Sequence, residues 1–136
     1  HRWGDVHIQN LCMARASRLS AAGSALRRNI PFTFHQDTPV LPPDMLHSVW
    51  CAVERCTAKG VVLGEKERIS VVDALRAVTV NAAHQYFEEG QKGSLRPGKA
   101  ADFVLLDANP LTVPADRLRG IRVLETIKGG KTLFRA

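Results

Sequence analysis

Apolar and polar residues alternate over residues 30–37, and the stretch ends in a polar run before a proline turn. The apolar residues Ile30, Phe32 and Phe34 fall at even positions, and the polar residues Thr33, His35 and Asp37 fall at odd positions. Because a strand sends alternate side chains to opposite faces, this pattern predicts a strand over 30–36 with one face packed under helices. In an α/β barrel, the residues at the C-terminal ends of strands carry the chemistry, so Asp37 is the first candidate for an active-site residue.

Three other stretches have the apolar spacing of helices, over residues 11–29, 42–60 and 70–87. Asp44, which follows two prolines, suits the start of the second helix, since aspartate is a good cap and proline fits a first turn. Gly60 is expected to end that helix. Ser70 and Asp73 resemble a capping box at the start of the third.

The pattern changes after Gly90, where glycine and proline separate shorter apolar runs. Strands are expected over 101–107, 121–128 and 132–135, the last two joined by the turn at Gly129 and Gly130. Three such short strands are few for an independent sheet. We therefore expect them to complete a sheet whose other strands lie elsewhere.

The chain has 136 residues, which is enough for one domain but too short for a complete α/β barrel of roughly 250 residues. It begins at His1 and its first methionine is Met13, which suggests a portion of a longer protein, although a processed chain could begin in the same way. No apolar run reaches the length of a membrane span, and no signal peptide is visible.

A net charge of +6 can indicate a protein that binds nucleic acid, but here the cations are scattered and no basic run interleaves with aromatic residues. Nucleic-acid binding is therefore the weakest hypothesis, and a basic surface that complements an acidic partner segment fits equally well.

The three cysteines, Cys12, Cys51 and Cys56, form no CxxC pair. They indicate reduced thiols in a cytoplasmic protein, without a cysteine zinc site.

Four blocks, over residues 34–40, 49–64, 74–83 and 92–107, together resemble the amidohydrolase superfamily, and within it the branch of N-substituted formamide deformylase-like enzymes. The first block is similar to the family's His-Ser-Asp-x-Pro-Val, with Gln36 in place of the usual serine. The fourth, the most specific, resembles the family's entry into its C-terminal sheet. The blocks follow the family's order and cover nearly the whole chain.

The resemblance implies an α/β fold: the C-terminal part of a (β/α)8 TIM-barrel metal-dependent hydrolase over residues 1–90, then strands of a small β-sandwich over 91–136. It implies hydrolysis of a C–N bond in a small amide or formamide with a divalent metal, for which we expect zinc. Asp37 falls at the position of the carboxylate that follows the eighth strand, contacts the metal and moves the proton of the attacking water. The family's His-x-His pair is not found here, so the other ligands are expected outside this chain.

Each candidate also has a plainer interpretation. Asp37 could be a turn aspartate before Pro39, and His35 could be either a contact for substrate or metal ligand or a satisfied interior histidine. Since a catalytic zinc needs three protein ligands, we expect the chain to be inactive by itself. The alternative function is an interaction module that self-associates, or pairs with the missing barrel portion, through its apolar faces. A solvent-exposed Asp37 with no strand before it would count against the metal-site interpretation.

Overall fold

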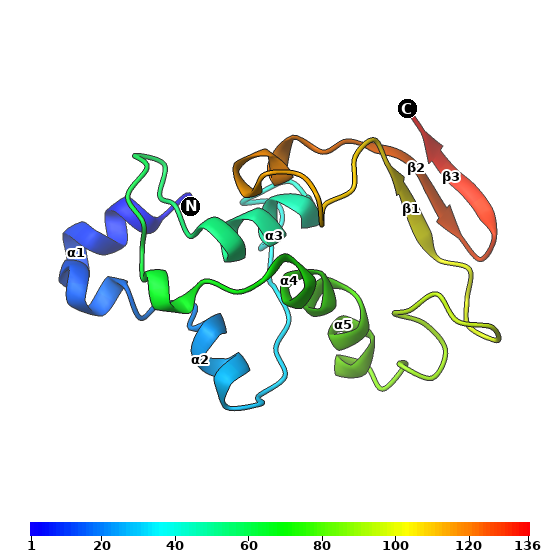
Figure 1. Ribbon diagram of the computed structural model, residues 1–136, viewed down its shortest axis with the longest axis horizontal. Coiled ribbons are helices and arrows are strands. Elements are labelled where there is room, and N and C mark those ends of the chain that lie inside the picture. Colours follow the sequence, from blue (N-terminus) through cyan, green and yellow to red (C-terminus); the bar gives the residue numbers. More distant parts are fainter.

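The computed structural model describes residues 1–136, in which helices precede an antiparallel sheet (Figure 1). The α-helices are α1 (Gly4–Ala16), α2 (Ala22–Arg27), α3 (Met45–Glu54), α4 (Val71–Val78) and α5 (Val80–Gln85). The strands are β1 (Phe103–Leu106), β2 (Val123–Lys128) and β3 (Lys131–Arg135), and the short 3-10 helices are η1 (Glu65–Glu67) and η2 (Ala115–Gly120). None of the helices has the length and apolar composition that crossing a membrane requires.

The first predicted helix, over 11–29, is wrong in its bounds, because the chain forms α1 and α2 with a break between them. Ser20 adopts a left-handed conformation with φ 51° at this break. The carbonyls of Leu19 and Ser20 accept hydrogen bonds from the guanidinium of Arg55 at 2.7 and 2.9 Å. A distant side chain thus takes backbone acceptors that a continuous helix would have used internally.

Both predicted helix starts are confirmed, but the second helix ends earlier than predicted and the third is not continuous. The Asp44 carboxylate accepts from the backbone N–H of His47 at 3.0 Å, and the Ser70 hydroxyl accepts from the N–H of Asp73 at 3.1 Å. Helix α3 ends at Glu54, well before Gly60, because Arg55 is left-handed with φ 52°. The third helix divides into α4 and α5 at Thr79, whose backbone is not helical.

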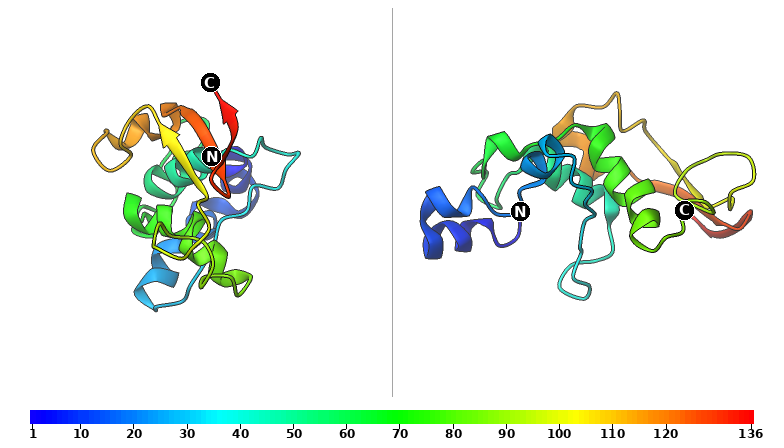
Figure 2. Two further views of the ribbon diagram at one scale, coloured as in Figure 1. Left: turned by 90° about the vertical axis from the view of Figure 1, so that its right-hand side faces the viewer. Right: turned by 90° about the horizontal axis from the view of Figure 1, so that it is seen from below.

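The three strands after residue 100 are confirmed and form one sheet in the order β1-β2-β3. Both neighbouring pairs are antiparallel, and β2 and β3 meet at the Gly129–Gly130 turn as predicted. The sheet stands at one end of an elongated molecule, and α1 lies at the other (Figure 1; Figure 2). Every residue of β3 is exposed.

The core is small for a chain of this length: 14 of 136 residues are buried. Half of them form two clusters that share α3, one around Val49 and Ile69 and the other around Trp50, Leu118 and Ile121. Many large apolar side chains remain at the surface, among them Leu133 and Phe134 of β3. The chain therefore buries part of its apolar surface and leaves much of it uncovered.

The predicted strand over 30–36 is not present, and residues 30–37 belong to no helix or strand. A strand needs a neighbour to accept and donate its backbone hydrogen bonds, and no other segment of this chain lies alongside it as a strand. The segment is held by side chains instead. The side-chain amide of Asn81 donates to the Phe32 backbone carbonyl at 3.0 Å, and the Thr33 hydroxyl donates to the side-chain Oε1 of Gln85 at 2.7 Å.

Candidate functional site

The segment that carries the candidate residues runs between α2 and α3. Phe32 and Phe34 pack against the cluster around Val49 with their ring centroids 5.9 Å apart. Their packing fixes one side of the segment against the helices. The loop that follows Asp37 projects from the body of the molecule in both views of Figure 2, where it is drawn in cyan.

His35 and Asp37 lie together on the outer side of this segment. The His35 Nε2 atom is 3.3 Å from Asp37 Oδ1, and the two side chains are 84% and 69% exposed. Asp37 is left-handed, with φ 58°. The expected placement of the carboxylate at the end of a strand, facing an interior, is therefore wrong for this chain. The structure brings the two candidates together at the surface rather than in a cavity.

An open pocket of about 740 Å³ lies beside the segment, bounded by the start of α1 and by α3. Its lining includes His35, Gln36, His47 and Cys51, but not Asp37. The Cys51 Sγ atom is 3.5 Å from His47 Nε2.

Burial raises the pKa of the Cys51 thiol, and burial lowers the pKa of His47. A thiol with a raised pKa is a weak nucleophile at neutral pH, because the thiolate is the reactive form. The pocket thus contains a Cys–His contact without an activated nucleophile.

The residues of this chain do not by themselves fit a catalytic metal ion. No group of three His, Cys, Asp or Glu side chains comes together anywhere in the structure, and the candidate site offers only His35 and Asp37. A catalytic zinc takes three protein ligands and leaves one position open. The zinc expected from the sequence therefore needs ligands from outside this chain.

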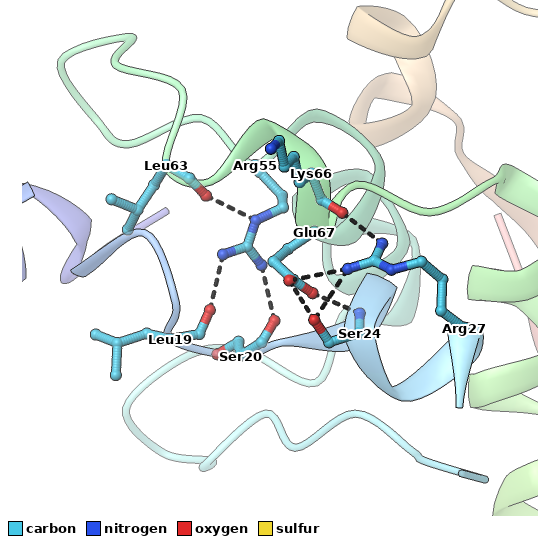
Figure 3. Close-up of polar contacts among 8 residues, drawn as sticks. All are labelled: Leu19, Ser20, Ser24, Arg27, Arg55, Leu63, Lys66 and Glu67. Carbon is cyan, nitrogen blue, oxygen red and sulfur yellow. Dashed lines mark hydrogen bonds and ion pairs between the residues drawn. The ribbon is translucent and has the colours of Figure 1, made fainter. Parts of the chain in front are cut away.

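A polar network joins the end of α3, the break before α2 and the segment around Glu67 (Figure 3). The Arg55 guanidinium donates to the carbonyls of Leu19, Ser20 and Leu63, and so ties the end of α3 to the break before α2. Partial burial of Arg55 lowers its pKa, while the charge of Glu67 acts in the opposite direction. This network appears in no sequence motif, because its bonds from Arg55 to Leu19 and Ser20 join residues that are 35 or more positions apart.

Glu67 completes the network at the start of α2. Its carboxylate accepts from the Ser24 N–H at 2.6 Å and from the Ser24 hydroxyl at 2.5 Å, and it lies 3.3 Å from the Arg27 guanidinium (Figure 3). The side-chain hydrogen bond from Ser24 is the main reason that the pKa of Glu67 lies below its usual value. Since α2 leads directly into residues 30–37, this contact helps to set the path of the candidate segment.

Comparison with known proteins shows the family of this chain. Residues 4–134 match the model of the Amidohydrolase family, which is nearly the whole sequence. The chain belongs to the amidohydrolase family. The resemblance drawn from the four sequence blocks is confirmed.

The curated relatives are much longer than this chain. It is 39% identical to Protein LONG AFTER FAR-RED 3 of Arabidopsis thaliana over 82% of this chain and 19% of that protein. It is 30% identical to the N-substituted formamide deformylase of Arthrobacter pascens over 83% of this chain and 21% of the enzyme. The chain thus spans about a fifth of the length of these relatives.

A solved amidohydrolase from Thermotoga maritima overlaps the whole chain and 42% of its own length, at 17% identity and a TM-score of 0.46. A similarity of this size leaves the predicted barrel unconfirmed. What the structure establishes is a mixed set of helices followed by a three-stranded sheet.

Proposed function

We propose that this amidohydrolase-family chain is the C-terminal portion of a metal-dependent enzyme that hydrolyses a C–N bond in a small amide or formamide. The observation that carries the proposal is the family match over residues 4–134, together with 30% identity to a protein named N-substituted formamide deformylase. The name N-substituted formamide deformylase is that of the relative from Arthrobacter pascens. For this chain, N-substituted formamides are the first substrate class to test.

The proposed protein divides at about residue 90, with the last units of a (β/α)8 barrel before it and strands of an accessory β-sandwich after it. The position of all three strands at one end of the molecule supports this division (Figure 1), although Leu118 and Ile121, between β1 and β2, pack against Trp50 of α3. The exposed apolar side chains of β3, Leu133 and Phe134, are then covered by the remaining portion of the protein. Its three free cysteines favour the cytoplasm.

Within that protein, we assign Asp37 as the carboxylate of this chain that binds the metal, expected to be zinc, and accepts a proton from the attacking water. His35 supports the carboxylate or contacts the substrate. The assignment is supported by the place of Asp37 in the block that resembles the family's eighth-strand motif. In this chain alone Asp37 is exposed and no strand leads up to it, which counts against the assignment, so the proposal requires the rest of the protein to supply the neighbouring strand and the enclosure. Because this chain alone offers too few ligands, the rest of the protein is needed for activity.

The test uses the complete protein, para-nitroformanilide as the probe and metal analysis of the purified enzyme. Asp37→Asn should lower kcat by about 10²- to 10⁴-fold, the usual contribution of a positioned acid or base. Asp116→Asn is the matched control, since Asp116 is also exposed and makes no side-chain hydrogen bond or ion pair. Metal-dependent hydrolysis at the wild-type rate in Asp37→Asn would overturn the assignment.

A further inference from the structure

Gln36 connects the candidate segment to the start of α3 through its side-chain amide. The Oε1 atom accepts from the Asp44 N–H at 3.2 Å, and Nε2 donates to the Asp44 carbonyl and to the Ser48 hydroxyl, the latter at 2.5 Å. One amide group therefore pairs with both backbone groups of Asp44, much as a neighbouring strand would. The loop over 37–43 is closed at its base by this pair.

The anchor on α3 is itself well held. Asp44 is the N-cap of the helix, and its carboxylate accepts from the His47 N–H at 3.0 Å. Within the loop, the Val40 N–H donates to the Asp37 carbonyl at 2.7 Å. Gln36 is thus joined to a rigid helix start, while the residues on either side of it are free at the surface.

The direction of Gln36 decides the direction of its neighbours. Gln36 is half-buried and turned toward α3, whereas His35 and Asp37 are exposed. A non-glycine residue in the left-handed region is strained, and such a conformation persists only when the surrounding contacts hold it. At Asp37, with φ 58°, the contacts that do so are the Gln36 amide before it and the Val40 N–H after it.

We propose that Gln36 is a positioning residue, which holds His35 and Asp37 side by side at the surface, where the part of the protein that completes the site can reach them. The inference rests on the proposed role of Asp37, and it adds a residue to that site. Gln36 itself touches neither metal nor substrate. It acts by keeping the carboxylate in one orientation, so that the complete protein need not order the loop during the reaction.

The test compares three variants of the complete, metal-containing protein. Gln36→Met keeps the length of the side chain and removes its hydrogen bonds, and Ser48→Ala removes one acceptor only. Gln91→Met is the matched control, because the Gln91 side chain is exposed and makes no hydrogen bond. Hydrogen–deuterium exchange of the peptide with Val40, Leu41 and Asp44 reports on the loop, and kcat and KM for para-nitroformanilide report on the site.

For Gln36→Met we expect faster exchange in that peptide and a kcat about 10- to 100-fold lower, with KM within about twofold of wild type. Ser48→Ala should show a smaller change in the same direction, and Gln91→Met should show none. Unchanged exchange in Gln36→Met would refute the proposed contact. Faster exchange with unchanged kcat, while Asp37→Asn is inactive, would refute the positioning role and leave the role of Asp37 intact. An active Asp37→Asn would remove both proposals, whatever the exchange shows.

Discussion

Gly23 offers a sharp test of how α2 packs, because the structure predicts an effect of opposite sign to that of an isolated helix. A Cβ atom added to Gly23 would lie 2.7 Å from the Lys66 carbonyl oxygen and 2.9 Å from the Glu67 Cα. Both are backbone atoms, which cannot turn aside as a side chain can. In a free helix, Gly→Ala stabilises by about 1 kcal/mol. Here Gly23→Ala should destabilise.

The size of the effect follows from what α2 must give up. Relieving the clash moves the helix away from residues 66–67, and overpacking of this kind costs about 1–3 kcal/mol. The same movement stretches the bonds from Ser24 to the Glu67 carboxylate, now 2.5 and 2.6 Å long. Hydrogen bonds to charged groups contribute about 1.5–3 kcal/mol each, so their weakening adds to the cost. After subtracting the gain in helix propensity, we expect a net loss of about 2–4 kcal/mol.

The assay is urea unfolding of this chain, followed by far-ultraviolet circular dichroism. Gly23→Ala should lower the midpoint at an unchanged m-value. Gly90→Ala is the control, because a Cβ there meets no atom within 4 Å and its backbone is not left-handed. A higher free energy of unfolding in Gly23→Ala would refute the packing of α2 against residues 66–67.

Two further predictions concern Glu67, which binds the start of α2, and Ser70, which caps α4. The folded-state pKa of Glu67 is lowered, so its stabilisation is present above the ordinary glutamate value of about 4.3 and is lost as the pH falls through the lower folded value. Glu67→Gln should therefore lose less free energy of unfolding than the wild type as the pH is lowered. An equal dependence of that free energy on pH in the two proteins, measured by urea unfolding from pH 7 to 3, would contradict this. Ser70→Ala removes the cap of α4 and should lower the free energy of unfolding by about 1 kcal/mol. Ser94→Ala, at a serine whose hydroxyl makes no hydrogen bond, should change little, and equal effects of the two serine variants would argue against the cap.

The features that sequence predicted well are those that depend on near neighbours in the chain. The helix starts at Asp44 and Ser70 follow from a side chain that accepts an N–H three residues on. The β2–β3 hairpin follows from its glycine turn and its flanking strand residues. The family could be recognised for a related reason, since each of the four blocks that carry the resemblance is a short local stretch of this chain.

The features that sequence missed depend on partners far along the chain or outside it. Nothing near residues 17–21 signals that Arg55 will take the carbonyls of Leu19 and Ser20 and divide the predicted helix. The alternation over 30–36 is a real strand pattern, but a strand forms only beside another strand, and this chain supplies none there.

Sequence alone thus determined the family, the capped helix starts and the C-terminal hairpin. Only the tertiary structure decided where the helices end, how Gln36 closes the loop, and that Asp37 lies in solvent rather than in an interior. The physical reason is the range of the interactions: caps and turns are satisfied within a few residues. Enclosure of a carboxylate requires neighbouring surfaces from distant segments, and no segment of this chain covers Asp37.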